Sequence, residues 1–246
     1  MNNMLEPSRL RAVNDESNQP AIHGYTGYEI PPRLAHDAAA TVAEAERLWA
    51  AIARPDIMIR IPATPAGIEA LEELVHAGIN TDMTLIFSPF QVQAVRAAHR
   101  RGLARRLQDK LSVQRIASVA SVFTGRVDAA VDALLAHTAD VTAIAVRGRA
   151  GIAAARLIHR DWKHDNDTAF AVFAAFGAAP QSLLWVGDAA ATPGEAAPEI
   201  GLDAARAVLA QLAHHGIDLE TVGRQLLAAG LLQFEQAFDE LLAPAA

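Results

Sequence analysis

Short apolar runs alternate with longer amphipathic stretches along most of this chain. The apolar runs fall at residues 25–30, 57–61, 83–87, 116–123 and 182–186. Short apolar runs that end at turn residues are typical of buried strands. Stretches with apolar residues three and four positions apart separate them, as expected of helices that pack on a sheet. The alternation predicts an α/β fold with a parallel sheet, although five strands are fewer than the eight of a closed β/α barrel.

Two predicted helices have clear boundary signals. Asp37 is a good N-cap for a helix that ends before Pro55. In the next helix Thr64 is the expected N-cap, Pro65 suits the first helical position and Gly78 marks the end. Side-chain oxygens accept free backbone N–H groups at a helix start, and glycine readily adopts the left-handed conformation that ends one.

The other predicted helices are amphipathic or rich in alanine. They are expected at residues 89–107, from near Asp128, and at 142–162, 168–176, 203–215 and 219–242. The polar residues 163–167 read as a break between helices, and an Ala/Pro/Gly loop is expected after Gly187, as far as Glu199. The last third of the chain is therefore predicted to be mostly helical.

Composition narrows the class of protein. The chain has 246 residues, of which 52% are hydrophobic, so one domain over residues 21–246 is expected, preceded by a polar, loosely ordered arm at 1–20. Cysteine is absent, which excludes disulfides and thiolate chemistry. There is no signal-peptide core and no apolar run of about 18 residues, so a cytoplasmic protein without membrane association is expected. The net charge of −7 and the scattered basic residues argue against nucleic acid as a partner.

Several segments, in order along the chain, resemble the transaldolase family. They include IMIRIPATPAGI and AGINTDMTLIFS, then SVASVFTGRVD, and near the end GIDLETVGRQLLAAGLLQFEQAFDELL. Glu29 lies in a further match, YEIPPRLAHD, and GRAGIAAARL is another. The resemblance implies a class I aldolase of the TIM-barrel type, modified or incomplete and with extra C-terminal helices. It also implies that the chain starts at about the third barrel strand, without the strand that bears the family's acid/base aspartate. The family's serine-containing phosphate loop is replaced by WVGDAA.

Arg60 stands where the family carries its Schiff-base lysine. The covalent mechanism requires an amine that can lose its proton and attack a ketose carbonyl. A guanidinium keeps its charge because its pKa is above about 12, and its delocalised nitrogens are poor nucleophiles. The remaining lysines, Lys110 and Lys163, are expected at the opposite end of the barrel and after a helix, where neither can substitute. Ordinary transaldolase activity is therefore predicted to be absent.

Acidic residues are expected on both sides of Arg60. Glu29 lies on the preceding strand, and Asp82 replaces the family's asparagine on the following one. Because a buried guanidinium without partners costs several kcal/mol, an internal Glu29–Arg60–Asp82 cluster is predicted. This cluster either closes a former active site, binds a carboxylate or phosphate, or supports catalysis of another kind.

Four more positions match residues that line the family's substrate site. Arg126 lies in the segment that contacts the substrate phosphate, although a surface salt bridge would also explain an arginine there. Ser121 and Phe123 match substrate-lining positions, with core packing as the alternative. Thr84 either holds a water molecule, as in the family, or packs as a β-branched strand residue. No cofactor is expected, and the nine histidines show no metal-binding spacing such as HExxH.

Two classes of function remain open from sequence alone. The first is a transferase or lyase that acts on a ketose phosphate and uses Glu29, Thr84 and Arg126 around a site altered by Arg60, by a route independent of lysine. The second is a non-catalytic protein that binds a sugar phosphate or another small anion, or serves as a subunit. An incomplete parallel barrel leaves unpaired strand edges, so a homo-oligomer or a partner protein is expected to cover them.

Overall fold

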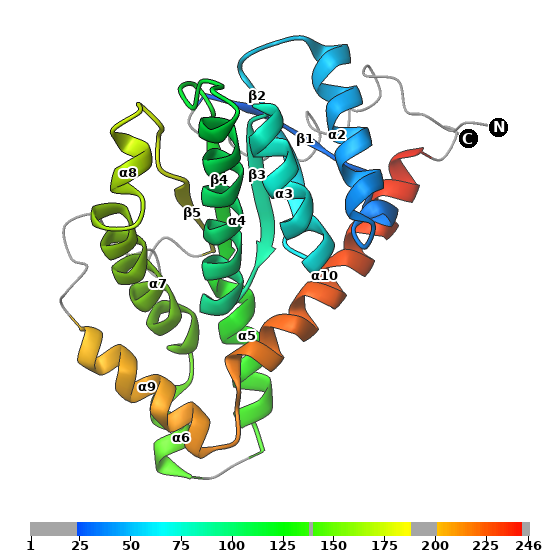
Figure 1. Ribbon diagram of the computed structural model, residues 1–246. Helices are drawn as coiled ribbons and strands as arrows, with labels where there is room; N and C mark the ends of the chain where they lie inside the picture. The colour runs from blue at the N-terminus through cyan, green and yellow to red at the C-terminus, as the bar shows by residue number, and fades with distance from the viewer. Residues whose placement is uncertain (1–23, 138–139, 188–200, 243–246) are drawn as a thin grey trace.

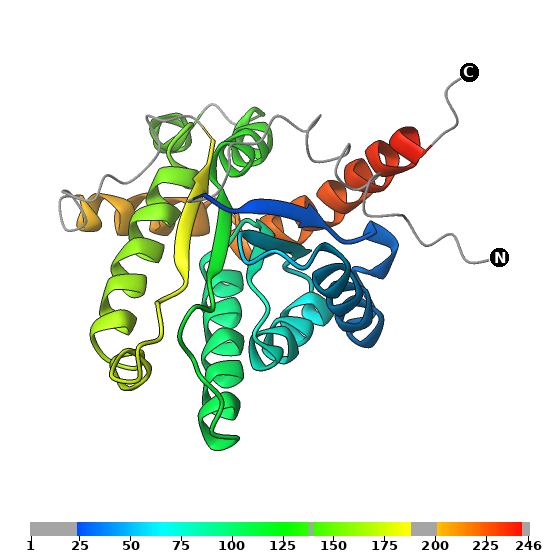
Figure 2. The same cartoon turned by 90° about the horizontal axis from the view of Figure 1, so that it is seen from above.

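The structure, a computed structural model, describes residues 24–137, 140–187 and 201–242. Its centre is one sheet of five parallel strands, in the order β1-β2-β3-β4-β5. The strands are β1 (Thr26–Glu29), β2 (Ile57–Pro62), β3 (Thr81–Ile86), β4 (Ser118–Phe123) and β5 (Ser182–Val186). Figure 2 shows the sheet as open, because β1 and β5 do not pair with each other. The predicted α/β fold with consecutive parallel strands is therefore confirmed.

Helices follow the strands and form the outer layer of the molecule. They are η1 (Pro32–Leu34), α2 (Ala38–Ile52), α3 (Pro65–Ala77), α4 (Pro89–Gln108), α5 (Thr124–Leu135), α6 (Val141–Val146), α7 (Ala150–Asp167), α8 (Ala171–Ala174), α9 (Leu202–His214) and α10 (Leu219–Leu242). Helices α2, α3, α4 and α7 lie along one side of the sheet (Figure 2). The long helix α10 crosses the lower end in Figure 1, where β3 ends, and contacts β3, α5 and η1. No helix among these residues is both long enough and apolar enough to cross a bilayer.

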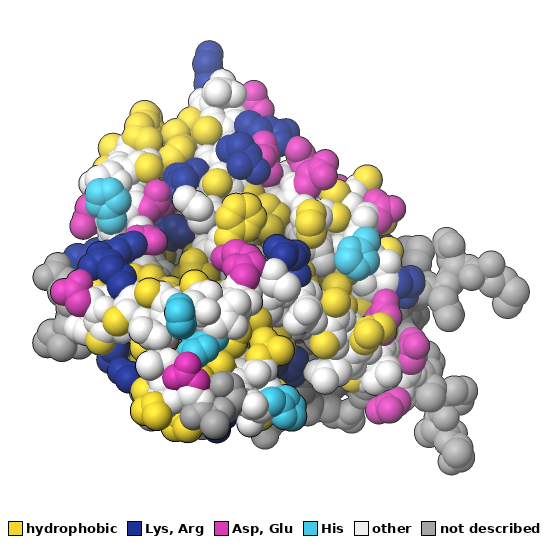
Figure 3. All heavy atoms as spheres, turned by 90° about the horizontal axis from the view of Figure 1, so that it is seen from below, with side chains coloured by type: hydrophobic (Ala, Val, Ile, Leu, Met, Phe, Trp, Pro, Cys, Tyr) yellow, Lys and Arg dark blue, Asp and Glu magenta, His cyan; other side chains and the backbone are white. Residues whose placement is uncertain are grey.

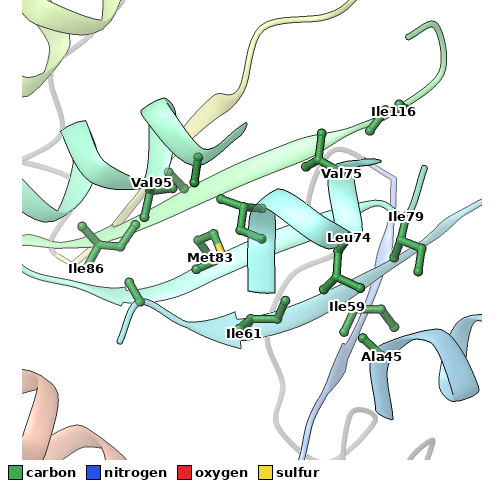
Figure 4. Close-up of a cluster of buried hydrophobic side chains, with 14 of the residues drawn as sticks. Ala45, Ile59, Ile61, Leu74, Val75, Ile79, Met83, Ile86, Val95 and Ile116 are labelled. Atoms are coloured by element: carbon green, nitrogen blue, oxygen red, sulfur yellow. The ribbon is translucent and has the colours of Figure 1, made fainter. Parts of the chain in front are cut away.

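The main hydrophobic core lies between the sheet and these helices. Ile59 and Ile61 of β2 point into it and are fully buried, together with Leu74 and Val75 of α3 (Figure 4). Successive strand residues point to opposite faces, so Met58 and Arg60 lie on the other face of β2. The sheet thus has an apolar face covered by helices and a second face on which Arg60 lies.

The predicted boundaries of the early helices are confirmed. Asp37 accepts the backbone N–H of Ala40 at 2.9 Å, and Thr64 accepts that of Gly67 at the same distance. Gly78 ends α3 with φ +87°, in the left-handed region. These local capping signals depend only on neighbouring residues, which is why the sequence alone contained them.

The predicted start of the helix after β4 is wrong. α5 begins at Thr124, directly after the strand, and its N-cap Phe123 makes no side-chain capping bond. Asp128 instead accepts the backbone N–H of Gly151 at 2.8 Å, at the start of α7. Its carboxylate therefore caps a helix that lies far along the chain.

The prediction of one helix over residues 142–162, with a break after it, is also wrong. The break falls between α6 and α7, at residues 147–149, where Gly148 has φ +65°. Residues 163–167 continue α7 because Asp165 binds Arg96 and Arg100 of α4. Only Ala171–Ala174 is helical in the predicted 168–176 segment.

Strand boundaries differ by up to two residues from those predicted. β3 begins at Thr81 because the hydroxyls of Thr81 and Ser118 lie 3.0 Å apart in a buried contact, so polar residues join the strands. The predicted N-terminal arm and the Ala/Pro/Gly loop lie outside the described residues. That residues 21–246 form a single domain stays a prediction.

Candidate functional site

The sheet places Glu29, Arg60 and Asp82 side by side on three neighbouring strands. Glu29 of β1 is aligned with Arg60 of β2, and Arg60 is aligned with Asp82 of β3. Aligned residues of adjacent parallel strands point to the same face of a sheet. The strand register alone therefore brings one cation between two acids.

Arg60 binds both acids in the structure. Its Nε donates to Oδ2 of Asp82 at 3.0 Å, and its Nη1 donates to Oε1 of Glu29 at a longer 3.5 Å. The Ser121 hydroxyl donates to Oδ1 of Asp82 at 2.7 Å. The side chains of Arg60 and Asp82 are only 6% and 2% exposed. The predicted Glu29–Arg60–Asp82 cluster is thus present, with Ser121 as a fourth member; we call these four residues the arginine network.

Gly27 makes room for the guanidinium. A Cβ on this residue would lie 2.5 Å from Nε of Arg60 and 2.8 Å from its Cζ, closer than atoms that are not bonded can approach. Gly27 lies two residues before Glu29, opposite Met58. The side chain of Arg60 therefore leans back toward the amino ends of the strands.

A pocket of about 230 Å³ lies at the carboxyl ends of the strands, and we call it the carboxyl-end pocket. Its lining comes from β1, β2, β3, the β4–α5 junction and α10: Glu29, Pro62, Thr84, Leu85, Phe123, Arg126, Gly230, Gln233, Phe234 and Ala237. Glu29 thus belongs to both the network and the pocket, whereas Arg60, Asp82 and Ser121 do not line it. The view in Figure 3 looks at this end of the molecule, where acidic and basic side chains are interspersed among hydrophobic ones.

An irregularity in β3 shapes one wall of the pocket. The pairing of β3 with β4 shifts register between Met83 and Ile86, and Leu85 has φ +57°. This bulge lets the consecutive residues Thr84 and Leu85 both face the pocket, which a regular strand does not allow. Leu85 also packs against Gly230, where a Cβ would lie 3.1 Å from its Cδ2.

Arg126 lies at the exposed edge of the pocket. Its Cζ lies 5.8 Å from the ring centroid of Phe123, a contact between a cation and an aromatic face. The ring of Phe123 in turn packs against Phe87, with centroids 5.5 Å apart. Arg126 makes no salt bridge among those found in the described residues, so its charge is available to the pocket.

Burial controls the ionisation of the two acids. It raises the pKa of Glu29 to about 7, with Arg60 acting in the opposite direction and Asp82 adding to the rise. Burial also raises the pKa of Asp82, but Arg60 and the Ser121 hydroxyl act against that rise. Asp82 has the shorter contact with the guanidinium and a second donor, so it is the better-stabilised anion of the pair.

Sequence reasoning found part of this site and missed part. It named Glu29, Thr84, Phe123 and Arg126, which line the pocket. It also named Arg60, Asp82 and Ser121, which instead form the buried network. The contribution of α10 was missed, and the only sequence signal for it was Gly230 within a helix, where glycine often marks a close approach.

Neither lysine approaches the site. Lys110 lies after the end of α4 and Lys163 lies on α7, and both are exposed. Among the described residues no three His, Asp or Glu side chains lie close enough together to hold a metal ion.

Parallel strands followed by helices, with a pocket where the strands end, define a β/α protein of the TIM-barrel type with an open sheet. The model of the transaldolase/fructose-6-phosphate aldolase family matches residues 10–245. This chain therefore belongs to that family.

Curated relatives bear the name transaldolase. The protein of Thiobacillus denitrificans is 37% identical over 254 residues, which cover 89% of this chain and 71% of the relative. That of Neisseria gonorrhoeae is 39% identical, covering 90% of this chain and 71% of its own length. Transaldolase 1 of Streptomyces coelicolor is 35% identical, with 95% and 70% covered.

Proposed function

We propose that this chain binds a sugar phosphate or a similar small organic anion in the carboxyl-end pocket and does not form a Schiff base. Membership of the transaldolase family supports a role in carbohydrate metabolism of the pentose phosphate type. Ordinary lysine-dependent transaldolase turnover is absent under this proposal.

The observation that carries the proposal is the state of Arg60. Its guanidinium is buried, bound to Asp82 and Glu29, and turned away from the pocket. It keeps its charge at physiological pH and cannot attack a carbonyl carbon. Lys110 and Lys163 are the only side-chain amines of the chain, and both lie outside the pocket lining.

Arg126 supports the anion-binding part of the proposal. A guanidinium binds phosphate or carboxylate oxygens with two parallel hydrogen bonds. Thr84 and Gln233 add hydroxyl and amide groups to the same lining, which suits the hydroxyls of a sugar. The carboxyl-end location agrees with the position of ligand sites in β/α barrels.

A second candidate is an enzyme that acts on a ketose phosphate without lysine. The relatives' name and the raised pKa of Glu29 favour it, because a group that titrates near neutral pH can both give and accept a proton. Glu29 lines the pocket and is the residue expected to serve as the acid or base.

Borohydride trapping with fructose 6-phosphate tests the absence of a Schiff base. Intact mass measurement should show no adduct, and a coupled assay should show no transaldolase turnover, whereas the Thiobacillus denitrificans relative serves as the positive control. A stoichiometric adduct on Lys110 or Lys163 would overturn the proposal. Turnover without an adduct would select the second candidate.

Calorimetric titration with fructose 6-phosphate tests anion binding. The unmodified chain should bind it, and Arg126→Gln should weaken binding at least tenfold, because a guanidinium–phosphate pair contributes about 1.5 to 3 kcal/mol. Arg206→Gln on α9 is a control, since Arg206 is exposed and pairs with Asp203 outside the pocket. Unchanged affinity in Arg126→Gln would remove the pocket as the binding site.

A further inference from the structure

The arginine network has one positive charge and two acids, and the two acids differ in the hydrogen bonds that they accept. Asp82 accepts from Arg60 at 3.0 Å and from Ser121 at 2.7 Å. Glu29 accepts from Arg60 only at 3.5 Å. One guanidinium balances one carboxylate, so a second ionised acid in the same buried place lacks a counter-charge.

The second oxygen of Glu29 points to which acid is neutral. Oε2 of Glu29 is buried and has no hydrogen-bond partner among the residues that the structure describes. A buried oxygen without a donor is far more costly on a charged carboxylate than on a neutral carboxyl group. The rise of the pKa of Glu29 to about 7 agrees with this geometry.

Glu29 lies where its charge affects a ligand. It lines the carboxyl-end pocket together with Arg126, and the residues that α10 adds there, Gly230, Gln233, Phe234 and Ala237, are uncharged. Arg60 from β2 and Asp82 from β3 are the charged groups that act on its carboxyl. With Glu29 neutral, Arg126 is the single charge among the described residues of the lining; with Glu29 ionised, these residues have no net charge.

We propose that Glu29 holds the single proton of the arginine network and that this proton sets the anion affinity of the carboxyl-end pocket. The protonated form binds anions, and loss of the proton as the pH rises weakens anion binding. Anion binding is accordingly accompanied by proton uptake. This inference rests on the proposed anion site at Arg126 and adds its regulation by pH.

Inorganic sulfate is the suitable probe because its charge does not change near neutral pH. If only the protonated form binds, a group with a pKa of about 7 lowers the affinity about tenfold between pH 6 and pH 8. Glu29→Gln, which imitates the neutral acid, should bind sulfate equally at both pH values, with the affinity of the unmodified chain at pH 6. Equal affinity of the unmodified chain at pH 6 and pH 8 would overturn the inference.

A second measurement needs no variant at Glu29. Calorimetry of sulfate binding at pH 7, in two buffers with different ionisation enthalpies, should reveal an uptake of about half a proton. Binding without proton uptake contradicts the inference but leaves the anion site intact. Absence of sulfate binding at pH 6, or binding that Arg126→Gln does not affect, contradicts the anion site itself.

Discussion

At the scale of single residues, Arg60 determines how the acids around it ionise. Its charge is fixed, and Asp82 beside it is almost fully enclosed. Without the guanidinium, Asp82 and Glu29 would be two buried acids with no cation, and each would have to stay protonated to avoid an uncompensated charge. The energetic role of Arg60 therefore depends on pH.

Arg60→Met should destabilise the protein more at pH 8 than at pH 5. At pH 5 the two buried acids of the variant stay protonated at a small cost in folding free energy. At pH 8 the unfolded chain releases both protons, whereas the folded variant must keep them because it has no cation beside the acids. The expected difference in the loss of unfolding free energy is about 3 kcal/mol, measured by urea denaturation at both pH values.

The control is Arg54→Met, which removes the exposed ion pair with Asp56. Exposed pairs contribute about 0 to 1 kcal/mol, so little change is expected at either pH. An equal loss at pH 5 and pH 8 in Arg60→Met would contradict the role assigned to the network.

At the scale of helices and strands, α3 and α4 approach closely at Gly102. A Cβ on Gly102 would lie 2.7 Å from both the carbonyl oxygen of Glu72 and Cβ of Val75. The backbone of α4 therefore lies directly against α3, and the two helices cover the sheet as one layer.

Gly102→Ala should force these helices apart. We expect a loss of about 1 to 3 kcal/mol in unfolding free energy, typical of an added methyl group in a packed interior. Gly125→Ala, in α5, is the matched control because the nearest atom to its Cβ would be 3.8 Å away. Thermal unfolding compares them, and equal melting temperatures would contradict the close contact.

The sequence predicted those features that depend on nearby residues. Thr64 and Gly78 bound α3 as their local signals indicated, and the ion pairs of Arg60 followed from the chemistry of a buried guanidinium. The predicted helix start near Asp128 is wrong because the Asp128 carboxylate caps α7, a helix distant in sequence, and not its own helix. The bulge at Leu85 and the approach of α10 also depend on the assembled fold; the bulge has no local signal in the chain, and Gly230 alone indicates the close approach of α10.

At the scale of the whole molecule, two buried groups give opposite pH dependences of stability. Burial, aided by Arg96 and Arg100, lowers the pKa of His99 to about 3. Its unfolded value is about 6.5, so protons bind the unfolded chain preferentially and stability falls as the pH drops below about 6.5. Glu29, with its raised pKa, loses its stabilising contribution as the pH rises from about 4.5 to about 7.

Between about pH 4.5 and pH 6.5 the effects of His99 and Glu29 on the pH dependence of unfolding free energy cancel. A variant that removes one of the two groups should therefore reveal the pH dependence caused by the other. Relative to the unmodified chain, His99→Leu should gain about 1.4 kcal/mol in unfolding free energy for each unit of pH decrease in this range, and Glu29→Gln should lose a similar amount. Urea denaturation at pH 5 and pH 6 measures both. Parallel changes in the two variants would contradict the opposed titrations.

The open sheet leads to a prediction about assembly. Among the described strands, β1 and β5 each pair with one neighbour, so each has an edge of backbone groups without a strand partner. Such edges favour pairing with another chain. Sedimentation velocity should show a dimer or larger assembly, and a monodisperse monomer would contradict this expectation.

The space beside Gly27 couples the residue at position 27 to the residue at position 60. With any larger residue at position 27, the arginine cannot adopt its present conformation, because the added Cβ would overlap its Nε. Substitutions at positions 27 and 60 are therefore not independent of each other. A lysine at position 60 would leave the guanidinium's volume empty beside the two acids. Installing a functional lysine at position 60 is thus a problem of several coupled substitutions, and a single codon change does not solve it.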